Sequence, residues 1–213
     1  MAFSYVGNFP NQQVSNSGVL SLDDINNLES TGELGGSLEL LQSQTFSSTV
    51  SYIDFTSIKE SKYDVHFMTL NNMKTAGDNQ DVVSFRFYES GVLETASVYN
   101  QLNQTVSTIS GLTDYERRST SASYITYLFG TGTATGEQVN GYAYFYNLGN
   151  TNKYSFMSAQ FMGLSDATLP MSSFGGGLLP QASVVDGIRV MKNTGDYSGF
   201  KVKLYGVKQI WVT

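Results

Sequence analysis

Cysteine is absent from this 213-residue chain, and histidine occurs only once. The lack of cysteine excludes disulfide bonds and thiolate metal ligands, and one histidine cannot build a familiar zinc site. Basic residues are also few: 12 lysines and arginines stand against 18 acidic residues, for a formal net charge of −6. This charge repels a phosphate backbone, and no cluster of basic and aromatic residues offsets it. We therefore expect no metal, no cofactor and no nucleic-acid partner.

Long apolar runs are missing as well. No stretch approaches the roughly 18 consecutive apolar residues of a membrane-spanning helix. The start MAFSYVGNFPNQQ has neither the basic segment nor the continuous apolar segment of a secretion signal. We expect neither membrane insertion nor secretion.

Aromatic residues and glycine are abundant instead. The chain contains 14 tyrosines, 13 phenylalanines and 21 glycines, a composition typical of aromatic strands joined by glycine turns. Short runs of alternating apolar and polar residues recur between turn signals. They predict an all-β protein, a jelly-roll-like antiparallel β-sandwich. We expect its strands at 37–46, 51–58, 62–70, 82–90, 121–129, 138–148, 153–163, 183–193 and 199–207.

The first 36 residues differ from the rest. Residues 1–18 are rich in Asn, Gln, Ser and Gly and are too polar to fold alone. In SLDDINNLES, Ser21 precedes Asp24 by one helical turn and apolar residues recur at the same spacing, which predicts a short helix capped at Ser21. We divide the chain into an N-terminal arm and helix, 1–36, and a sandwich domain, 37–213. The residues expected to anchor the chain to another subunit or to a particle are Phe3, Tyr5, Phe9, Leu22, Ile25, Leu28 and, near the C-terminal end, Trp211.

Two of the predicted strands have a clear inside and outside. Between 82 and 90, Val83, Phe85 and Phe87 share one face, and the opposite face is more polar. Between 199 and 207, residues 200, 202, 204 and 206 are apolar or glycine, whereas 201, 203 and 205 are Lys, Lys and Tyr. We expect the first set of each strand to face the core and the second to face solvent.

The predicted strand 138–148 carries Tyr142, Tyr144 and Tyr146 on one face. Cross-strand packing is the commoner reason for such a row, whereas an exposed row forms a platform on which a sugar ring stacks. Both interpretations stay open, and the three tyrosines are the candidate binding face.

Catalytic residues are hard to find in this sequence. His66 lies in a predicted strand without a nucleophile or an orienting acid at a recognisable spacing, so we expect a packed or surface histidine instead of a general base. No spacing pairs two of the carboxylates that a glycosidase would need, which are Asp54, Asp64, Glu89, Asp114, Glu116 and Asp186. We predict no catalytic residue and no enzyme.

Three segments resemble ligand-binding loops only in composition. GTGTATG (130–136) lacks the lysine of a P-loop, and SFGGGLLP (173–180) is not followed by a helix that could bind an anion, so both are predicted loops. AGDNQD (76–81) offers oxygen atoms to calcium but departs from the EF-hand spacing, and we interpret it as a turn.

The stretch SVVDGIRVMKNTGDYSGFKVKLYGVK (183–208) resembles the end of structural proteins of marine bacteriophages, including those of cyanobacteria and pelagic bacteria. The resembling pattern is an apolar strand with the triplet 187–189 (GIR), a glycine turn, and a strand that ends in the triplet 204–206 (LYG). GVLSLDDI, GGSLELLQSQT and SYIDFTSIKESKYDVHF are also similar to such proteins, and together these stretches cover roughly half of the chain. The resemblance implies a virion component of β-sandwich type whose chain finishes as paired strands, and it brings no catalytic residues.

These observations lead to the hypothesis of a non-enzymatic phage virion structural protein of the tail-fibre or adsorption type, which mediates attachment through protein or glycan binding. It would assemble in the host cytoplasm and reside in the virion. Its partners would be copies of itself, with a trimer favoured, other virion proteins, and a glycan or protein of the host surface. A capsid decoration or head-fibre protein is the alternative within the same class. The alternatives from other classes are a polysaccharide depolymerase with facing carboxylates and a free carbohydrate-binding module with a planar row of exposed tyrosines.

Overall fold

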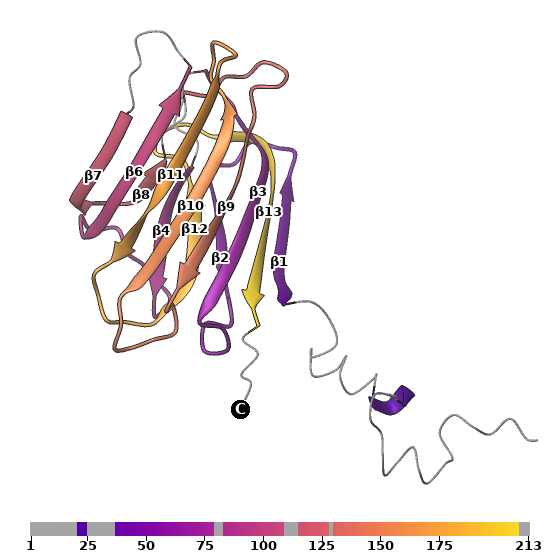
Figure 1. The fold of residues 1–213 in the computed structure, drawn as a ribbon, viewed down its shortest axis with the longest axis vertical. Coiled ribbons are helices and arrows are strands. Elements are labelled where there is room, and N and C mark those ends of the chain that lie inside the picture. The colour runs from indigo at the N-terminus through magenta and orange to yellow at the C-terminus, as the bar shows by residue number, and fades with distance from the viewer. Residues whose placement is uncertain (1–20, 25–36, 79–82, 109–114, 128–129, 209–213) are drawn as a thin grey trace, which may run out of the picture. The chain divides into compact units, whose positions relative to one another are not determined.

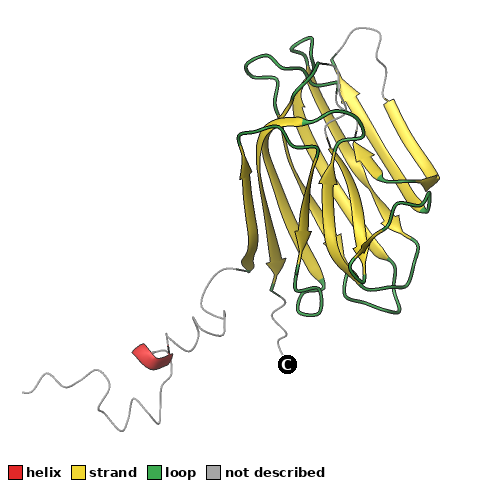
Figure 2. Cartoon of the chain, turned by 180° about the vertical axis from the view of Figure 1, so that it is seen from behind, coloured by secondary structure: helices red, strands yellow, loops and turns green. Residues whose placement is uncertain are grey.

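The computed structural model describes residues 21–24, 37–78, 83–108, 115–127 and 130–208. Apart from a helical turn at 22–24, these residues form strands and the loops between them (Figures 1 and 2). The strands are β1 Leu38–Phe46, β2 Tyr52–Thr56, β3 Val65–Thr75, β4 Val83–Glu89, β5 Val92–Leu93, β6 Tyr99–Ser107, β7 Tyr115–Ala122, β8 Ile125–Tyr127, β9 Val139–Tyr146, β10 Ser155–Leu164, β11 Pro170–Leu179, β12 Val185–Met191 and β13 Tyr197–Val207.

The strands form two antiparallel sheets that pack as a sandwich (Figure 1). The larger sheet has eight strands in the order β1-β13-β3-β9-β10-β11-β6-β7. The smaller sheet has five, with the order β2-β12-β4-β5 and β8 paired to β4. From β1 to β4 the chain changes sheet at every connection, whereas β9, β10 and β11 follow one another as neighbours. The prediction of a jelly-roll-like antiparallel β-sandwich is confirmed.

Aromatic side chains from both sheets fill the centre of the core. The five residues concerned are fully buried: Phe85 and Phe87 on β4, Tyr127 on β8, Phe145 on β9 and Phe161 on β10. The ring centroids of neighbouring members lie between 5.0 and 6.4 Å apart. Burial of one such side chain contributes about 1.5–3 kcal/mol. The cluster therefore joins the two sheets through the hydrophobic effect.

The predicted inner faces of β4 and β13 are confirmed, and the predicted outer faces are confirmed only in part. Val83, Phe85 and Phe87 are buried, and so are the even-numbered residues 200–206, whereas Lys201 is exposed. Ser84, which was expected to face solvent, is buried, and its hydroxyl is satisfied there by donating to Thr126 Oγ1 at 2.8 Å.

The segment 173–180 is not the loop that its glycines suggested, because most of it belongs to β11. This strand lies inside the larger sheet, between β10 and β6. Gly175 has a φ of 143°, and a Cβ atom there would lie 2.3 Å from the carbonyl oxygen of Leu102. Glycine therefore lets the neighbouring strands approach closely at a position where a side chain would collide with the backbone.

The end of the chain also differs from the expectation that the phage resemblance gave. β12 pairs with β2 and β4 of the smaller sheet, whereas β13 pairs with β3 and lies beside β1 in the larger sheet. The last two strands are therefore not paired with each other, and residues 192–196 connect the two sheets. The predicted strand at 121–129 is likewise divided, since β7 ends at Ala122 in one sheet and β8 begins at Ile125 in the other.

The predicted helix cap at Ser21 is confirmed. The Asp24 backbone N–H donates to Ser21 Oγ at 3.1 Å, and the Ser21 backbone N–H donates to Asp24 Oδ2 at 2.9 Å. This reciprocal pair is a capping box, and its hydrogen bonds lower the pKa of Asp24. By internal contacts the chain divides into a unit Met1–Glu39, which contains this helical turn, and a unit Leu40–Thr213.

Candidate functional site

The tyrosines predicted as a binding face lie on the outer face of the larger sheet. On β9, Ala143 and Phe145 point into the core, whereas Tyr142, Tyr144 and Tyr146 alternate with them and point outward. Tyr142 is 40% exposed, and the other two tyrosines are half-buried. The sequence pattern therefore identified one face of this strand correctly.

Rings from two neighbouring strands extend this row. The register aligns Tyr205 of β13 with Phe67 of β3, and Phe67 with Tyr144 of β9. The Phe67 ring centroid lies 4.8 Å from that of Tyr144 and 6.1 Å from that of Tyr205. Along β9, the ring centroid of Tyr144 lies 6.0 Å from that of Tyr142 and 6.3 Å from that of Tyr146. We call these five residues, Phe67, Tyr142, Tyr144, Tyr146 and Tyr205, the tyrosine face.

Polar groups and further exposed aromatics border the tyrosine face on β10 and β11. The Tyr142 hydroxyl donates to Gln160 Oε1 at 3.0 Å, and the Tyr146 hydroxyl lies 3.2 Å from Ser158 Oγ. Phe156 and Phe174 are 41% and 42% exposed. The rings pack across strands, as the first interpretation held. For the second interpretation, Tyr142 is exposed, whereas Phe67, Tyr144, Tyr146 and Tyr205 are half-buried. Rings with hydroxyl and amide groups beside them can stack on the C–H face of a sugar and hydrogen-bond its hydroxyls.

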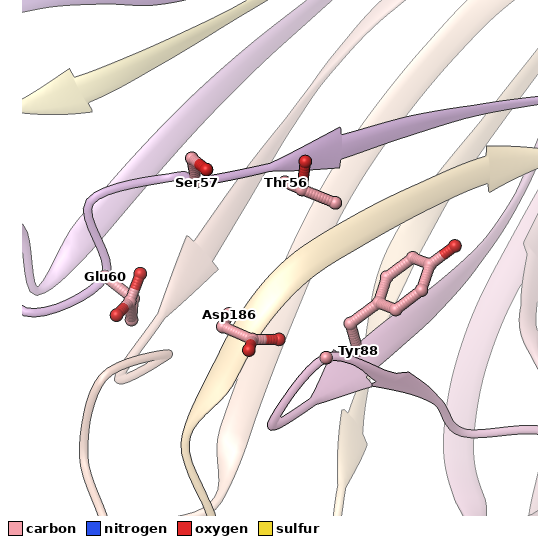
Figure 3. Close-up of a pocket in the computed structure, with 6 residues that line it drawn as sticks. Thr56, Ser57, Glu60, Tyr88 and Asp186 are labelled. Atoms are coloured by element: carbon pink, nitrogen blue, oxygen red, sulfur yellow. The ribbon is translucent and has the colours of Figure 1, made fainter.

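A pocket of about 320 Å³ opens on the outer face of the smaller sheet (Figure 3). In the close-up, Asp186 lies between Glu60 and Tyr88. The full lining consists of Thr56, Ser57, Glu60, Tyr88, Gly91 and Asp186. The sequence analysis included Asp186 among the available carboxylates but did not identify Glu60. The two residues lie far apart in the sequence, in β12 and in the loop after β2, and only the fold brings them to one pocket.

An arginine fixes the wall of this pocket. Arg189 donates through Nε to Asp54 Oδ1 and through Nη2 to Asp54 Oδ2, both at 2.7 Å, and Nη2 also donates to the Tyr88 hydroxyl at 2.7 Å. The guanidinium carbon lies 3.8 Å from the centroid of the Tyr52 ring. Partial burial and then Asp54 raise the pKa of Tyr88, and the hydrogen bond to Asp54 raises the pKa of Arg189. We call Arg189, Asp54, Tyr88 and Tyr52 the arginine network.

His66 is a packed histidine, as predicted. Its side chain is buried, and Nε2 lies 2.8 Å from the carbonyl oxygen of Ile58. The Tyr63 ring stands edge-on to the imidazole at 6.0 Å. Burial lowers the pKa of His66, so the imidazole is neutral near pH 7. Its visible role is to hold the loop that follows β2.

The carboxylates considered for glycoside hydrolysis occupy separate environments. Asp54 is bound by Arg189, Glu116 lies 3.1 Å from Arg118 on β7, and Glu89 accepts a hydrogen bond from the Ser183 hydroxyl. Asp64 precedes β3, and Asp114 lies outside the described residues. Asp186 is the member of the set that reaches the pocket.

The remaining predictions concern anchors and loops. Leu22 is 77% exposed, whereas the other anchoring candidates, Phe3, Tyr5, Phe9, Ile25, Leu28 and Trp211, lie outside the described residues. Segment 130–136 is a loop apart from an isolated bridge residue, Thr131, as predicted. Of segment 76–81, only residues 76–78 are described, and there Asp78 Oδ1 accepts hydrogen bonds from the backbone N–H and hydroxyl of Thr133 at 2.8 and 2.9 Å.

Within the described part of the chain, no group of three His, Asp or Glu side chains could hold a metal ion. None of the helical residues described belongs to a helix long and apolar enough to cross a membrane. Comparison of the chain with protein-family models, with curated proteins and with solved structures gives no match.

Proposed function

We propose that the chain is a non-enzymatic structural protein of a bacteriophage virion, of the tail-fibre or adsorption type, which attaches the particle to a glycan of the host surface. It assembles with copies of itself, with a trimer favoured, and joins the particle through its N-terminal arm. The source of the virion assignment is the resemblance of 183–208 and of the N-terminal stretches to marine phage structural proteins.

The tyrosine face is the observation that supports glycan attachment. Its five rings stand on three adjacent strands, and Gln160 and Ser158 lie beside them as hydrogen-bonding groups. A rigid sheet holds these rings in place before a ligand arrives, which limits the entropy lost on binding. Repeated rings along one face suit a repeating polysaccharide, because several weak contacts add within one chain of sugars.

Binding of the purified protein to immobilised host polysaccharide tests this proposal. Tyr142→Ala removes the most exposed ring of the row, and we expect a dissociation constant at least about tenfold higher, equivalent to about 1.4 kcal/mol. Tyr115→Ala is the matched control, because Tyr115 is an exposed tyrosine on the edge strand β7. Its binding should equal that of the original protein, and both variants should keep the β circular dichroism of the folded protein.

Three results would contradict the proposal. Equal binding by Tyr142→Ala would remove the tyrosine face from attachment. An equal loss in Tyr115→Ala would show that the effect is not specific to this face. Release of reducing ends from the polysaccharide above a buffer control would show a depolymerase instead of an attachment protein.

A further inference from the structure

The pocket on the smaller sheet is a second candidate for ligand binding, on the face of the sandwich opposite the tyrosine face. Its volume of about 320 Å³ lies at the lower end of the range of small-molecule sites, roughly 300–1,000 Å³. We propose that it binds one uncharged sugar ring through the carboxylates of Glu60 and Asp186. This inference rests on the proposed glycan attachment, which it extends to a second subsite.

Asp186 points into the pocket because β12 is irregular at this position. The pairing of β12 with β4 shifts between Val185 and Gly187, so Asp186 is an extra residue without a partner in that register. Such a bulge redirects one side chain relative to a regular strand. Gly187 follows, and a Cβ atom there would lie 3.0 Å from the Tyr88 ring. The glycine therefore lets the Tyr88 ring lie directly over β12, beside Asp186.

The Tyr88 wall is held before any ligand arrives. Its hydroxyl accepts a hydrogen bond from Arg189, which is itself bound by Asp54 through two hydrogen bonds and lies over Tyr52. The ring that lines the pocket therefore cannot rotate away without breaking the arginine network. A fixed aromatic wall presents a surface for the C–H groups of a sugar at little cost in conformational entropy.

Glu60 is positioned by a tightly packed loop. Ser57 and Lys59 have positive φ values of 56° and 55°, and the intervening Ile58 is fully buried. His66 contacts the Ile58 carbonyl, and a Cβ atom on Gly149 would lie 2.2 Å from the Glu60 carbonyl oxygen. Burial of Ile58 and close backbone contact therefore fix the backbone of Glu60 at the pocket.

The chemistry of the lining selects the ligand. Glu60 and Asp186 as carboxylates can only accept hydrogen bonds, Thr56 and Ser57 can donate or accept, and none of the six lining residues is a cation. A ligand with several hydroxyl groups supplies the hydrogens that the carboxylates need, and its C–H face fits the Tyr88 ring. A uronic or sialic acid would bring a third negative charge beside two carboxylates and is therefore disfavoured.

Backbone chemical-shift mapping by NMR tests this assignment on the full chain. The probes are glucose, galactose, mannose, N-acetylglucosamine, glucosamine and glucuronic acid. We expect at least one uncharged sugar to shift the amide signals of Ser57 and Gly91, and glucuronic acid to bind at least about tenfold more weakly. Asp186→Asn should weaken that binding about tenfold, whereas Glu116→Gln, which changes an exposed acid on β7, should leave it unchanged.

Each outcome decides between the two surfaces. Shifts at the pocket that disappear in Asp186→Asn support the assignment, whatever happens at the tyrosine face. Shifts confined to Tyr142, Tyr144 and Tyr146 overturn the pocket assignment and leave the proposed function standing. The assignment is also overturned if no uncharged sugar shifts the pocket amides, if glucosamine alone binds, or if glucuronic acid binds as well as glucose.

Discussion

Replacing Arg189 with methionine removes a guanidinium that three neighbouring side chains hold. Nε and Nη2 donate to Asp54 at 2.7 Å each, Nη2 donates to the Tyr88 hydroxyl at 2.7 Å, and the group lies 3.8 Å from the centroid of the Tyr52 ring. Methionine keeps much of the apolar stem, so the substitution chiefly removes the charged head.

The expected loss follows from the exposure of the ion pair. The side chains of Arg189 and Asp54 are 18% and 29% exposed, so both are largely, but not fully, removed from water. Hydrogen bonds to charged groups contribute about 1.5–3 kcal/mol, and a cation–π contact at a partly exposed site about 0.5–1 kcal/mol. Asp54 keeps some access to water in the variant, so the larger penalty of a fully buried unpaired charge does not apply. We expect the free energy of unfolding to fall by about 2–4 kcal/mol.

Urea denaturation of Arg189→Met, Asp54→Asn and the double variant measures the pair directly. We expect a coupling energy of about 1–2 kcal/mol, within the range found for residues in one network. Arg118→Met is the control, because the Arg118–Glu116 pair is 76% and 54% exposed and should contribute less than about 1 kcal/mol. The reasoning is refuted if Arg189→Met destabilises the protein no more than Arg118→Met, or if the coupling energy is near zero.

Three further predictions concern stability and assembly. Burial lowers the pKa of His66, so the unfolded chain binds a proton at this imidazole more readily than the folded chain does. The free energy of unfolding therefore does not depend on His66 above about pH 6.5 and decreases below that pH, by at most about 1.4 kcal/mol per pH unit. His66→Gln should remove this part of the pH dependence of thermal melting without weakening attachment; an unchanged pH profile would contradict it. Gly175→Ala should lower the free energy of unfolding by about 1–3 kcal/mol. Alanine is strained at the positive φ of this position, and its Cβ atom would collide with the carbonyl oxygen of Leu102. The Cβ atom of Gly199→Ala would lie 3.4 Å from the carbonyl oxygen of Phe46, so this variant should lose less free energy of unfolding. Equal losses for the two variants in urea denaturation would refute the argument. Deletion of residues 1–18 should preserve the β circular dichroism and the melting temperature but abolish assembly, which size-exclusion chromatography measures; unfolding of the truncated chain would place the arm in the core.

Strand alternation predicted those parts of the fold in which burial and apolar character coincide. β4 and β13 are such strands, since every second residue is apolar and faces the core. β6 gave no such signal, because its buried residues include Gln101, Asn103 and Thr105. These buried polar groups form hydrogen bonds: the Asn103 amide donates to the Thr126 carbonyl at 2.7 Å, the Thr126 N–H donates to the Gln101 side chain at 3.0 Å, and the Thr105 hydroxyl donates to Ser173 Oγ at 2.9 Å. These long-range pairings do not depend on any local periodicity.

The candidate surfaces were predictable to different extents. The period of two along β9 placed three tyrosines on one face, but Phe67 and Tyr205 join them only through the register of β3 and β13. The pocket depends on a bulge at Asp186 and on a buried loop anchor near Glu60, and neither has a sequence signature. The glycine run in β11 led to the wrong prediction of a loop. Glycine is typical of loops, but it is also required where neighbouring strands approach closely, and a single sequence does not distinguish the two cases.

The measurement that tests the central claim most directly is electron microscopy of phage particles labelled with an antibody against this chain. The account predicts label at the tail or at its fibres. Label on the shell would contradict the adsorption role and favour a capsid decoration or head-fibre protein, and particles without label would contradict the virion assignment itself.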